Sequence, residues 1–228
     1  MSSAGVVTRL AVRELWISFR LLALLAAFVG VGAIVALLPA PAFVTLPRLA
    51  IGLGAAMVVA CGIAADAIST ERALGRAGWL VTRSISRPTL LVGWFTALSS
   101  ITVLGLSAAG ILGWLATASP RVAVAPAGFA AVLGGVAAMA LAFVAVGLLL
   151  GTMLRTWVAS VTAVMTGVAT VTATLLVAPA AVVPLAALAD LAALERPIGD
   201  GLTGAGVFLA VTAASLVAAS VAMARVDL

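Results

Sequence analysis

The sequence contains no histidine and no lysine, has one cysteine, and carries charged side chains at only 8% of its 228 positions. A phosphate-binding P-loop needs a lysine, so the chain has no such site for hydrolysing ATP. The lack of histidine excludes Cys/His metal sites, histidine-based intramembrane proteolysis and most acid–base chemistry. Cys61 alone leaves no intrachain disulfide. With no catalytic constellation in the sequence, we expect neither an enzyme nor a metal or cofactor site in this chain.

Apolar residues make up 65% of the chain. Six uncharged runs approach or exceed the ~20 residues that a helix needs to cross the hydrocarbon core of a bilayer. We therefore predict an all-α polytopic membrane protein with a single transmembrane domain over residues 1–228. Trimmed at their prolines and glycines, the predicted helices cover residues 21–38, 49–67, 89–114, 128–152, 157–178 and 205–224. The first run lacks a small-residue cleavage pattern, which favours a mature helix over a cleaved signal.

Residues 5–20 have an amphipathic helical pattern that precedes the first span. At 100° per residue, the arginines share one narrow arc and several apolar residues lie opposite. The arginines are Arg9, Arg13 and Arg20, and the opposite side carries Thr8, Val12, Leu15 and Phe19. Trp16 beside the arginines suits a membrane interface. We predict a helix lying on the cytoplasmic membrane surface, with a solvated N-terminal helix as the alternative.

The arginines also predict the orientation, since cytoplasmic loops carry an excess of positive charge. With six crossings both termini share one side. If that side is the cytoplasm, nine arginines lie there: Arg9, Arg13, Arg20, Arg72, Arg76, Arg83, Arg87, Arg155 and Arg225. Only three lie outside: Arg48, Arg121 and Arg196. The sequence therefore predicts cytoplasmic termini.

A cytoplasmic loop over residues 66–88 collects four arginines around an apolar patch that contains Trp79 and Leu80. One interpretation is a basic anchor that sets the topology and interacts with anionic headgroups. The other is a docking site for a protein, with an aromatic centre and a charged rim. After the patch, Ser86 is placed to cap the third span and Pro88 to start its first turn.

The same loop resembles the cytoplasmic loop of ABC-transporter type-2 permeases. The pattern E-x-x-x-G, ten residues, then S-R is filled by Glu71, Gly75, Ser86 and Arg87. In that family the acidic residue ends the second span, the glycine starts a coupling helix that sits in a groove of the ATPase subunit, and the S-R turn begins the third span. The sequence departs from the family's frequent residues at three positions: Arg76, Ser84 and Trp94.

The resemblance implies the permease subunit of an ATP-binding-cassette exporter in the plasma membrane of a prokaryote. Its implied partners are cytoplasmic P-loop ATPase subunits that bind ATP and Mg²⁺, a second permease subunit and the lipid bilayer, with no nucleic acid. The implied substrate is amphipathic or lipid-like. The residues assigned to ATPase coupling are Glu71, Gly75, Arg76, Trp79, Leu80, Arg83, Ser86 and Arg87. The alternatives are a membrane scaffold or sensor that recruits a cytoplasmic partner, and a haem-exporter-like subunit.

Glu71 is the residue that we expect to carry coupling, by pairing with Arg20, with Arg87 or with an arginine of the ATPase. A stripe of hydroxyl groups marks the fifth span at four-residue spacing, and either packs against another helix or lines a path. It consists of Thr162, Thr166, Thr170 and Thr174. Glycines in the spans, namely Gly105, Gly147 and Gly151, favour helix packing. The segment 178–204 is interpreted either as one or two short helices that dip into the outer leaflet or as an ordinary outer loop.

Overall fold

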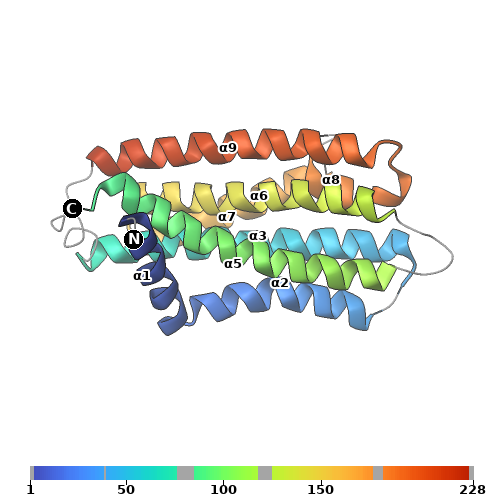
Figure 1. Ribbon diagram of the computed structural model, residues 1–228, viewed down its shortest axis with the longest axis horizontal. Coiled ribbons are helices and arrows are strands. Elements are labelled where there is room, and N and C mark those ends of the chain that lie inside the picture. Colours follow the sequence, from blue (N-terminus) through green and yellow to red (C-terminus); the bar gives the residue numbers. More distant parts are fainter. Residues whose placement is uncertain (1–2, 39, 76–84, 118–124, 177–181, 226–228) are drawn as a thin grey trace.

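The computed structural model describes residues 3–38, 40–75, 85–117, 125–176 and 182–225. Regular structure within these ranges is helical throughout, and six helices are long and apolar enough to cross a membrane, which confirms an all-α polytopic chain. These are α2 (Arg20–Leu37), α3 (Ala42–Ala73), α5 (Arg87–Thr117), α6 (Pro126–Met153), α7 (Thr156–Leu176) and α9 (Pro197–Arg225). They form an elongated bundle with both chain termini at one end (Figure 1).

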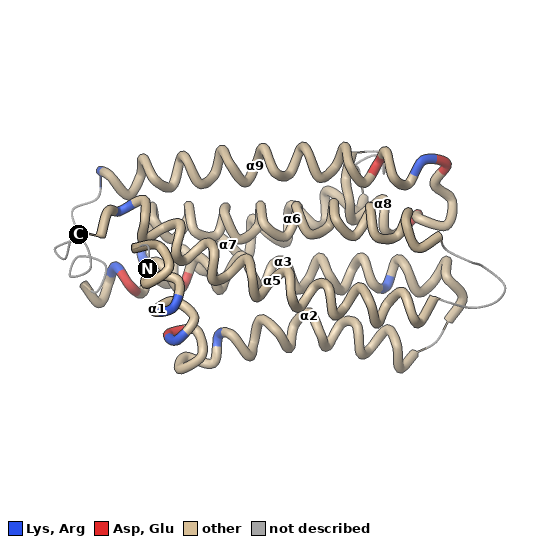
Figure 2. Tube along the Cα trace, in the orientation of Figure 1, with Lys and Arg blue, Asp and Glu red and all other residues tan. Residues whose placement is uncertain are grey.

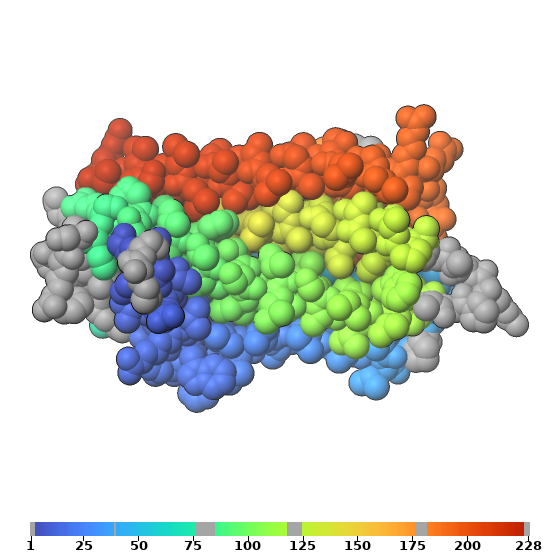
Figure 3. Space-filling view, in the orientation of Figure 1, coloured from blue at the N-terminus to red at the C-terminus, as the bar shows by residue number. Residues whose placement is uncertain are grey.

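Helices α3 and α6 form the centre of the bundle. Of the most apolar window of each helix, 61% is buried in α3 and 67% in α6, against 22% in both α7 and α9. Helix α7 packs mainly on α3, and α9 packs on α6 in the most extensive helix contact of the described chain. On the face shown in Figure 3, α9, α6, α5 and α2 lie side by side. The outer helices therefore present most of their surface to the surroundings.

Two glycines let α6 approach α3 closely. A Cβ atom added at Gly147 would lie 2.3 Å from the carbonyl oxygen of Cys61, and one at Gly151 would lie 2.5 Å from that of Ala65. Small residues allow such backbone contact between membrane helices. At Gly105 an added Cβ would lie 3.0 Å from Phe28, so this glycine also sits at a helix contact. The packing role predicted for these three glycines is confirmed.

Helix α3 begins at Ala42, seven residues before the predicted start, so the boundary that we placed after Pro47 is wrong. Proline deletes one backbone hydrogen bond, which is tolerated near a helix start. Thr45 lies in the preceding turn and donates its hydroxyl to the carbonyl oxygens of Ala40 (2.9 Å) and Pro41 (3.2 Å). Burial of apolar residues on both sides of Pro47 compensates for the missing bond. The buried neighbours are Leu46, Leu49 and Ala50.

Helix α9 begins at Pro197, and the predicted start at residue 205 is also wrong. Because glycine weakens a helix, the sequence predicts breaks at Gly201 and Gly204. Instead, both lie at contact points between helices. A Cβ at Gly201 would lie 2.6 Å from the carbonyl oxygen of Ala131 on α6, and one at Gly204 would lie 2.8 Å from Pro184. The gain from close packing exceeds the cost in helix propensity.

The segment 178–204 holds two short helices followed by the first turns of α9. The first is α8 (Pro184–Ala189) and the second is the single turn η1 (Leu191–Ala193). Five of the six residues of α8 are buried, and the helix packs against α3 and α6 at the end of the bundle opposite the termini (Figure 1). Because its apolar side chains are covered by protein, α8 is part of the bundle rather than an exposed loop.

Helix α1 (Ser3–Ile17) crosses the bundle near the start of α5 (Figure 1). Its buried stripe is Val7, Ala11 and Leu15, at four-residue spacing. A Cβ at Gly93 of α5 would lie 2.4 Å from Cγ1 of Val7, which shows how closely the two helices pack. One face of helix α1 therefore packs against α5.

This packing corrects the predicted helix over residues 5–20 in two respects. The helix packs on protein through Val7, Ala11 and Leu15, and of the predicted apolar side only Leu15 belongs to that stripe. The helix also ends at Ile17, and Ser18 donates its hydroxyl to the carbonyl oxygen of Glu14 at 2.7 Å. Phe19 then adopts a left-handed conformation (φ 59°), uncommon for a bulky residue, and redirects the chain into α2.

Candidate functional site

Charged residues lie at the two ends of the bundle and leave its middle apolar (Figure 2). Seven of the nine described arginines belong to α1 or to helix ends on the side of the termini, which we call the arginine-rich end. They are Arg9, Arg13, Arg20, Arg72, Arg87, Arg155 and Arg225. The opposite end carries Arg48, Asp190, Glu195, Arg196 and Asp200. The arginine-rich end is the candidate site, since the predicted coupling loop joins two of its helices.

Helix α3 ends at Ala73, so residues 66–73 of the predicted loop are helical, and the chain turns away from the helix at Gly75. This glycine has φ +69°, and its N–H donates to the carbonyl oxygen of Arg72 at 3.0 Å. A residue in the left-handed region after the last turn is a common helix terminator, and glycine adopts it without steric cost. Gly75 therefore has a local structural reason to stand at this position, independent of any coupling role.

Arg72, one turn before that terminus, bonds α3 to the end of α6. Its Nη1 donates to the carbonyl oxygens of Gly151 (3.0 Å) and Thr152 (2.6 Å). The last carbonyls of a helix lack partners within the helix and carry partial negative charge, so a guanidinium there satisfies them and interacts with the helix dipole. We did not assign a role to Arg72 from the sequence. Because Arg72 lies beyond the helix predicted over residues 49–67, its contact with α6 has no signal in the sequence.

Arg87 makes the corresponding contact at the other end of the loop. Its Nη1 donates to the carbonyl oxygens of Met223 (2.8 Å) and Ala224 (3.0 Å) in the last turn of α9. Beside it, the N–H of Thr89 donates to Ser86 Oγ at 3.3 Å, so Ser86 caps α5 as the sequence predicted. Pro88 lies in the first turn of α5, also as predicted. Both helix ends that border the loop are thus held to the C-terminal ends of other helices.

Glu71 lies in the last turns of α3 and is 6% exposed. Of the arginines expected as partners of Glu71, Arg20 forms an ion pair with Asp66 at 2.5 Å, and the partner of Glu71 stays a prediction. Asp66 and Glu71 are five residues apart, so on a helix they differ by about 140° in direction and about 7.5 Å along the axis. Asp66 is the one that faces the start of α2. The structure thus places Glu71 in a buried position on a different side of α3.

Of the predicted interfacial residues, Trp16 is 60% exposed on α1 and Arg9 and Arg13 are also exposed there, whereas Arg20 is the first residue of α2. Four of the predicted coupling residues, Arg76, Trp79, Leu80 and Arg83, lie outside the described residues. The other four, Glu71, Gly75, Ser86 and Arg87, lie at the two helix ends that border residues 76–84.

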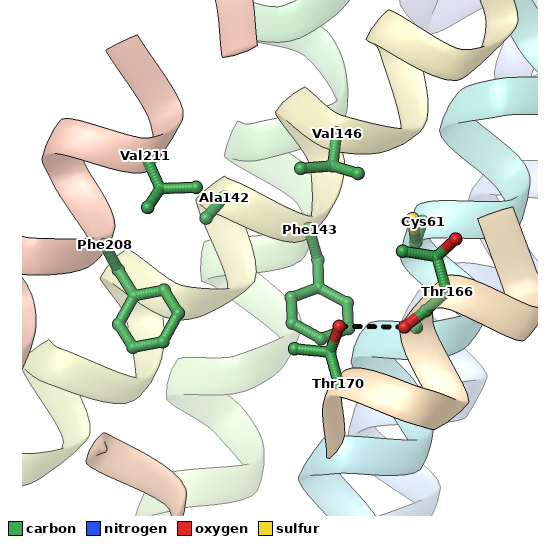
Figure 4. Close-up of a pocket in the computed structure, with 9 residues that line it drawn as sticks. Cys61, Ala142, Phe143, Val146, Thr166, Thr170, Phe208 and Val211 are labelled. Carbon is green, nitrogen blue, oxygen red and sulfur yellow. Dashed lines mark hydrogen bonds between the residues drawn. The ribbon is translucent and has the colours of Figure 1, made fainter. Parts of the chain in front are cut away.

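The threonine stripe of α7 lies partly along a lateral hollow of about 270 Å³ (Figure 4). Its walls come from four helices: Cys61 of α3; Ala142, Phe143 and Val146 of α6; Thr166, Gly167 and Thr170 of α7; Phe208 and Val211 of α9. Thr170 donates its hydroxyl to the carbonyl oxygen of Thr166 at 2.8 Å. The hydroxyl hydrogen of Thr170 is therefore used within α7. Since most of the other lining residues are apolar, the hollow is largely apolar.

The packed face of α7 is a different stripe. It consists of Ala159, Ala163, Gly167, Val171 and Thr174, which are buried, mainly against α3. Of the predicted threonine stripe, only Thr174 belongs to this face, and it donates its hydroxyl to the carbonyl oxygen of Val171. Thr162 is half-buried, while Thr166 and Thr170 border the hollow. Helix packing is therefore carried mainly by the small residues beside the threonines.

Among the described residues, no group of three or more histidine, cysteine or acidic side chains is placed to hold a metal ion. The chemistry available at the arginine-rich end is that of guanidinium groups, one buried carboxylate and helix termini. Such groups bind and position partners. The sequence matches no protein-family model and no curated protein.

Proposed function

We propose that this chain is the membrane-spanning permease subunit of an ATP-binding-cassette exporter of the type-2 kind. It would move an amphipathic or lipid-like substrate out of the cytoplasm with ATP hydrolysed by a separate subunit. The observation that carries the proposal is the pair of arginine contacts beside the loop. Arg72 holds the end of α3 to the end of α6, and Arg87 holds the start of α5 to the end of α9.

These contacts offer a mechanical route from the loop into the bundle. A displacement of residues 76–84 would move the adjoining ends of α3 and α5, and the arginines would pass that motion to α6 and α9. Helix α1 adds a second route, because Val7 packs closely on Gly93 of α5. Packed helices move as rigid elements, so small shifts at their ends can reach the far side of a bundle.

The outer helices support pairing with a second permease subunit. Helices α7 and α9 bury little of their surface, and large apolar side chains remain exposed along both. On α7 these include Trp157, Val161, Met165, Val168 and Leu176. Without a strong hydrophobic driving force between membrane helices, such faces meet either lipid or another subunit. A substrate path between two subunits follows from the resemblance.

The proposed orientation places the arginine-rich end in the cytoplasm. We expect Ile85→Cys to react with a membrane-impermeant maleimide only after the membrane is opened, and Ser119→Cys to react in intact cells. Both substitutions are made after Cys61→Ala, although the buried Cys61 thiol should itself react slowly. The reverse labelling pattern would invert the topology and remove the loop from the cytoplasmic side.

The test of the proposed function is the double substitution Trp79→Ala/Leu80→Ala. If this apolar patch docks an ATPase, its loss should weaken the association by about 2 kcal/mol or more, roughly thirtyfold, as for other aromatic anchors of interfaces. The measurement is co-elution of a P-loop ATPase with the purified protein in mild detergent, followed by the stimulation of its ATP hydrolysis. The membrane-inserted amount should stay unchanged.

The chain contains a matched control for this experiment. Residues 113–117 read GWLAT, close to GWLVT at 78–82, and lie at the opposite end of the bundle. Trp114→Ala/Leu115→Ala should therefore leave ATPase association intact. Co-elution of another soluble partner in place of an ATPase would favour the scaffold, and wild-type association after loss of Trp79 and Leu80 would reject the docking assignment.

A further inference from the structure

A second hollow, of about 470 Å³, lies at the arginine-rich end between α3 and the junction of α6 with α7. The junction is short: α6 ends at Met153, Leu154 is extended, and α7 begins at Thr156. The hollow is lined by the end of α3, including Arg72, and by residues 153–157. It is separate from the lateral hollow beside the threonine stripe, with which it shares no lining residue.

The charge of this hollow is positive. Arg72 and Arg155 line it, together with the polar Ser69 and Thr156, and none of the lining residues is acidic. Arg72 is held in place by its bonds to the end of α6, and its Nε is buried without a hydrogen-bond partner among the described residues. Within the same part of the chain, the Arg155 side chain has neither a hydrogen bond nor an ion pair. A fixed guanidinium and an unpaired one thus border the same space.

The rest of the hollow suits a ligand that is anionic at one end and apolar at the other. Trp157 is 73% exposed and Met153 is 62% exposed, and both line the hollow. Amphipathic aromatic side chains favour the level of lipid headgroups. The first turn of α7 also begins here, and its unpaired backbone N–H groups favour negative charge. An acyl chain could therefore pack on the exposed tryptophan while the anionic group binds at the two arginines.

We propose that this hollow binds the phosphodiester headgroup of an anionic phospholipid, with Arg72 and Arg155 facing the phosphate. The acyl chains would run along Met153 at the end of α6 and Trp157 at the start of α7. Basic pockets between membrane helices are suited to such headgroups, since an arginine near the surface contributes to binding electrostatically. The assignment is independent of ATPase coupling. A lipid bound here would stabilise the α6–α7 junction, which lies next to the carbonyl oxygens that accept hydrogen bonds from Arg72.

The experiment titrates full-length protein in mild detergent with phosphatidylglycerol or phosphatidylcholine and counts bound lipids by native mass spectrometry. We expect a phosphatidylglycerol-selective site that Arg155→Gln weakens about fivefold. Arg9→Gln removes an exposed arginine from the same end and should have less than about a twofold effect, since Arg9 lies outside the hollow. Inorganic phosphate at millimolar concentration should not displace the lipid.

Three results would overturn the assignment: equal binding of both lipids, equal losses in the two arginine variants, or displacement by inorganic phosphate, which would indicate a soluble anion. A measurement on the wild-type protein covers the case in which Arg155→Gln does not fold. Phosphatidylglycerol with a photoreactive headgroup should label residues 153–157. Labelling confined to other segments would place the lipid elsewhere and reject the site.

Discussion

Gly151→Leu is expected to lower the thermal stability of the bundle markedly. A Cβ atom alone would lie 2.3 Å from Cγ2 of Ile68 and 2.5 Å from the carbonyl oxygen of Ala65, so the central pair α3 and α6 would have to separate. Overpacking commonly costs about 1 to 3 kcal/mol, and a clash with backbone raises that cost. Since about 1 kcal/mol corresponds to about 2 to 4 °C for a domain of this size, the midpoint temperature of unfolding should fall by about 6 °C or more. Fluorescence-detected size-exclusion chromatography after mild heating measures the loss.

Gly134→Leu is the matched control for this experiment. It lies on the same helix, makes the same chemical change, and has no atom within 4 Å of an added Cβ. Leucine is also a better helix former than glycine. We therefore expect wild-type elution and thermal stability for Gly134→Leu. Equal behaviour of the two variants would contradict the close approach of α3 and α6.

Glu71→Gln is expected to lower substrate-stimulated ATP hydrolysis by about tenfold or more while leaving the membrane-inserted amount nearly unchanged. An exposed ion pair contributes only about 0 to 1 kcal/mol, whereas removal of one partner from a desolvated pair costs several. At 6% exposure Glu71 is desolvated, so a pair with the proposed arginine partner would belong to the second case. Glutamine keeps the shape of the side chain and removes its charge. The tenfold loss corresponds to about 1.4 kcal/mol at the coupling step.

The control for Glu71 is Glu195→Gln. Glu195 is exposed and precedes α9 at the opposite end of the bundle, so hydrolysis should remain at the wild-type rate. Arg87→Gln adds a second comparison, because it removes the bonds to the end of α9. If Glu71→Gln retains wild-type hydrolysis while Arg87→Gln only lowers expression, the loop is a topology anchor and the coupling role is wrong.

The errors in the helix boundaries share one cause. Pro47, Gly201 and Gly204 were interpreted as ends of helices from their local propensities, and each lies inside a helix. In α9 the glycines give contact with α6 and α8, and in α3 burial on both sides of the proline outweighs one missing bond. These gains come from residues distant in sequence. Propensity describes an isolated segment, and tertiary packing overrides it.

At the candidate site too, contacts within one helix turn could be predicted from the sequence and contacts between distant residues could not. Ser86 as a cap and Pro88 in the first turn could be predicted, because capping involves residues within one turn of each other. The bonds from Arg72 to α6 and from Arg87 to α9 could not, since they join residues 79 and 136 positions apart or more. The ion pair of Arg20 with Asp66 likewise depends on which side of α3 faces α2.

The sequence alone determined that the chain is helical and polytopic and that its charges collect at two ends. Both properties follow from the cost of placing charges and unpaired backbone groups in hydrocarbon, which is counted residue by residue along the chain. Only the tertiary structure decided which stripe of α1 and α7 is buried, which glycines are contact points, and which carbonyls each arginine satisfies. These outcomes depend on the distance and rotation between helices, and a span whose faces are nearly uniformly apolar does not encode them locally.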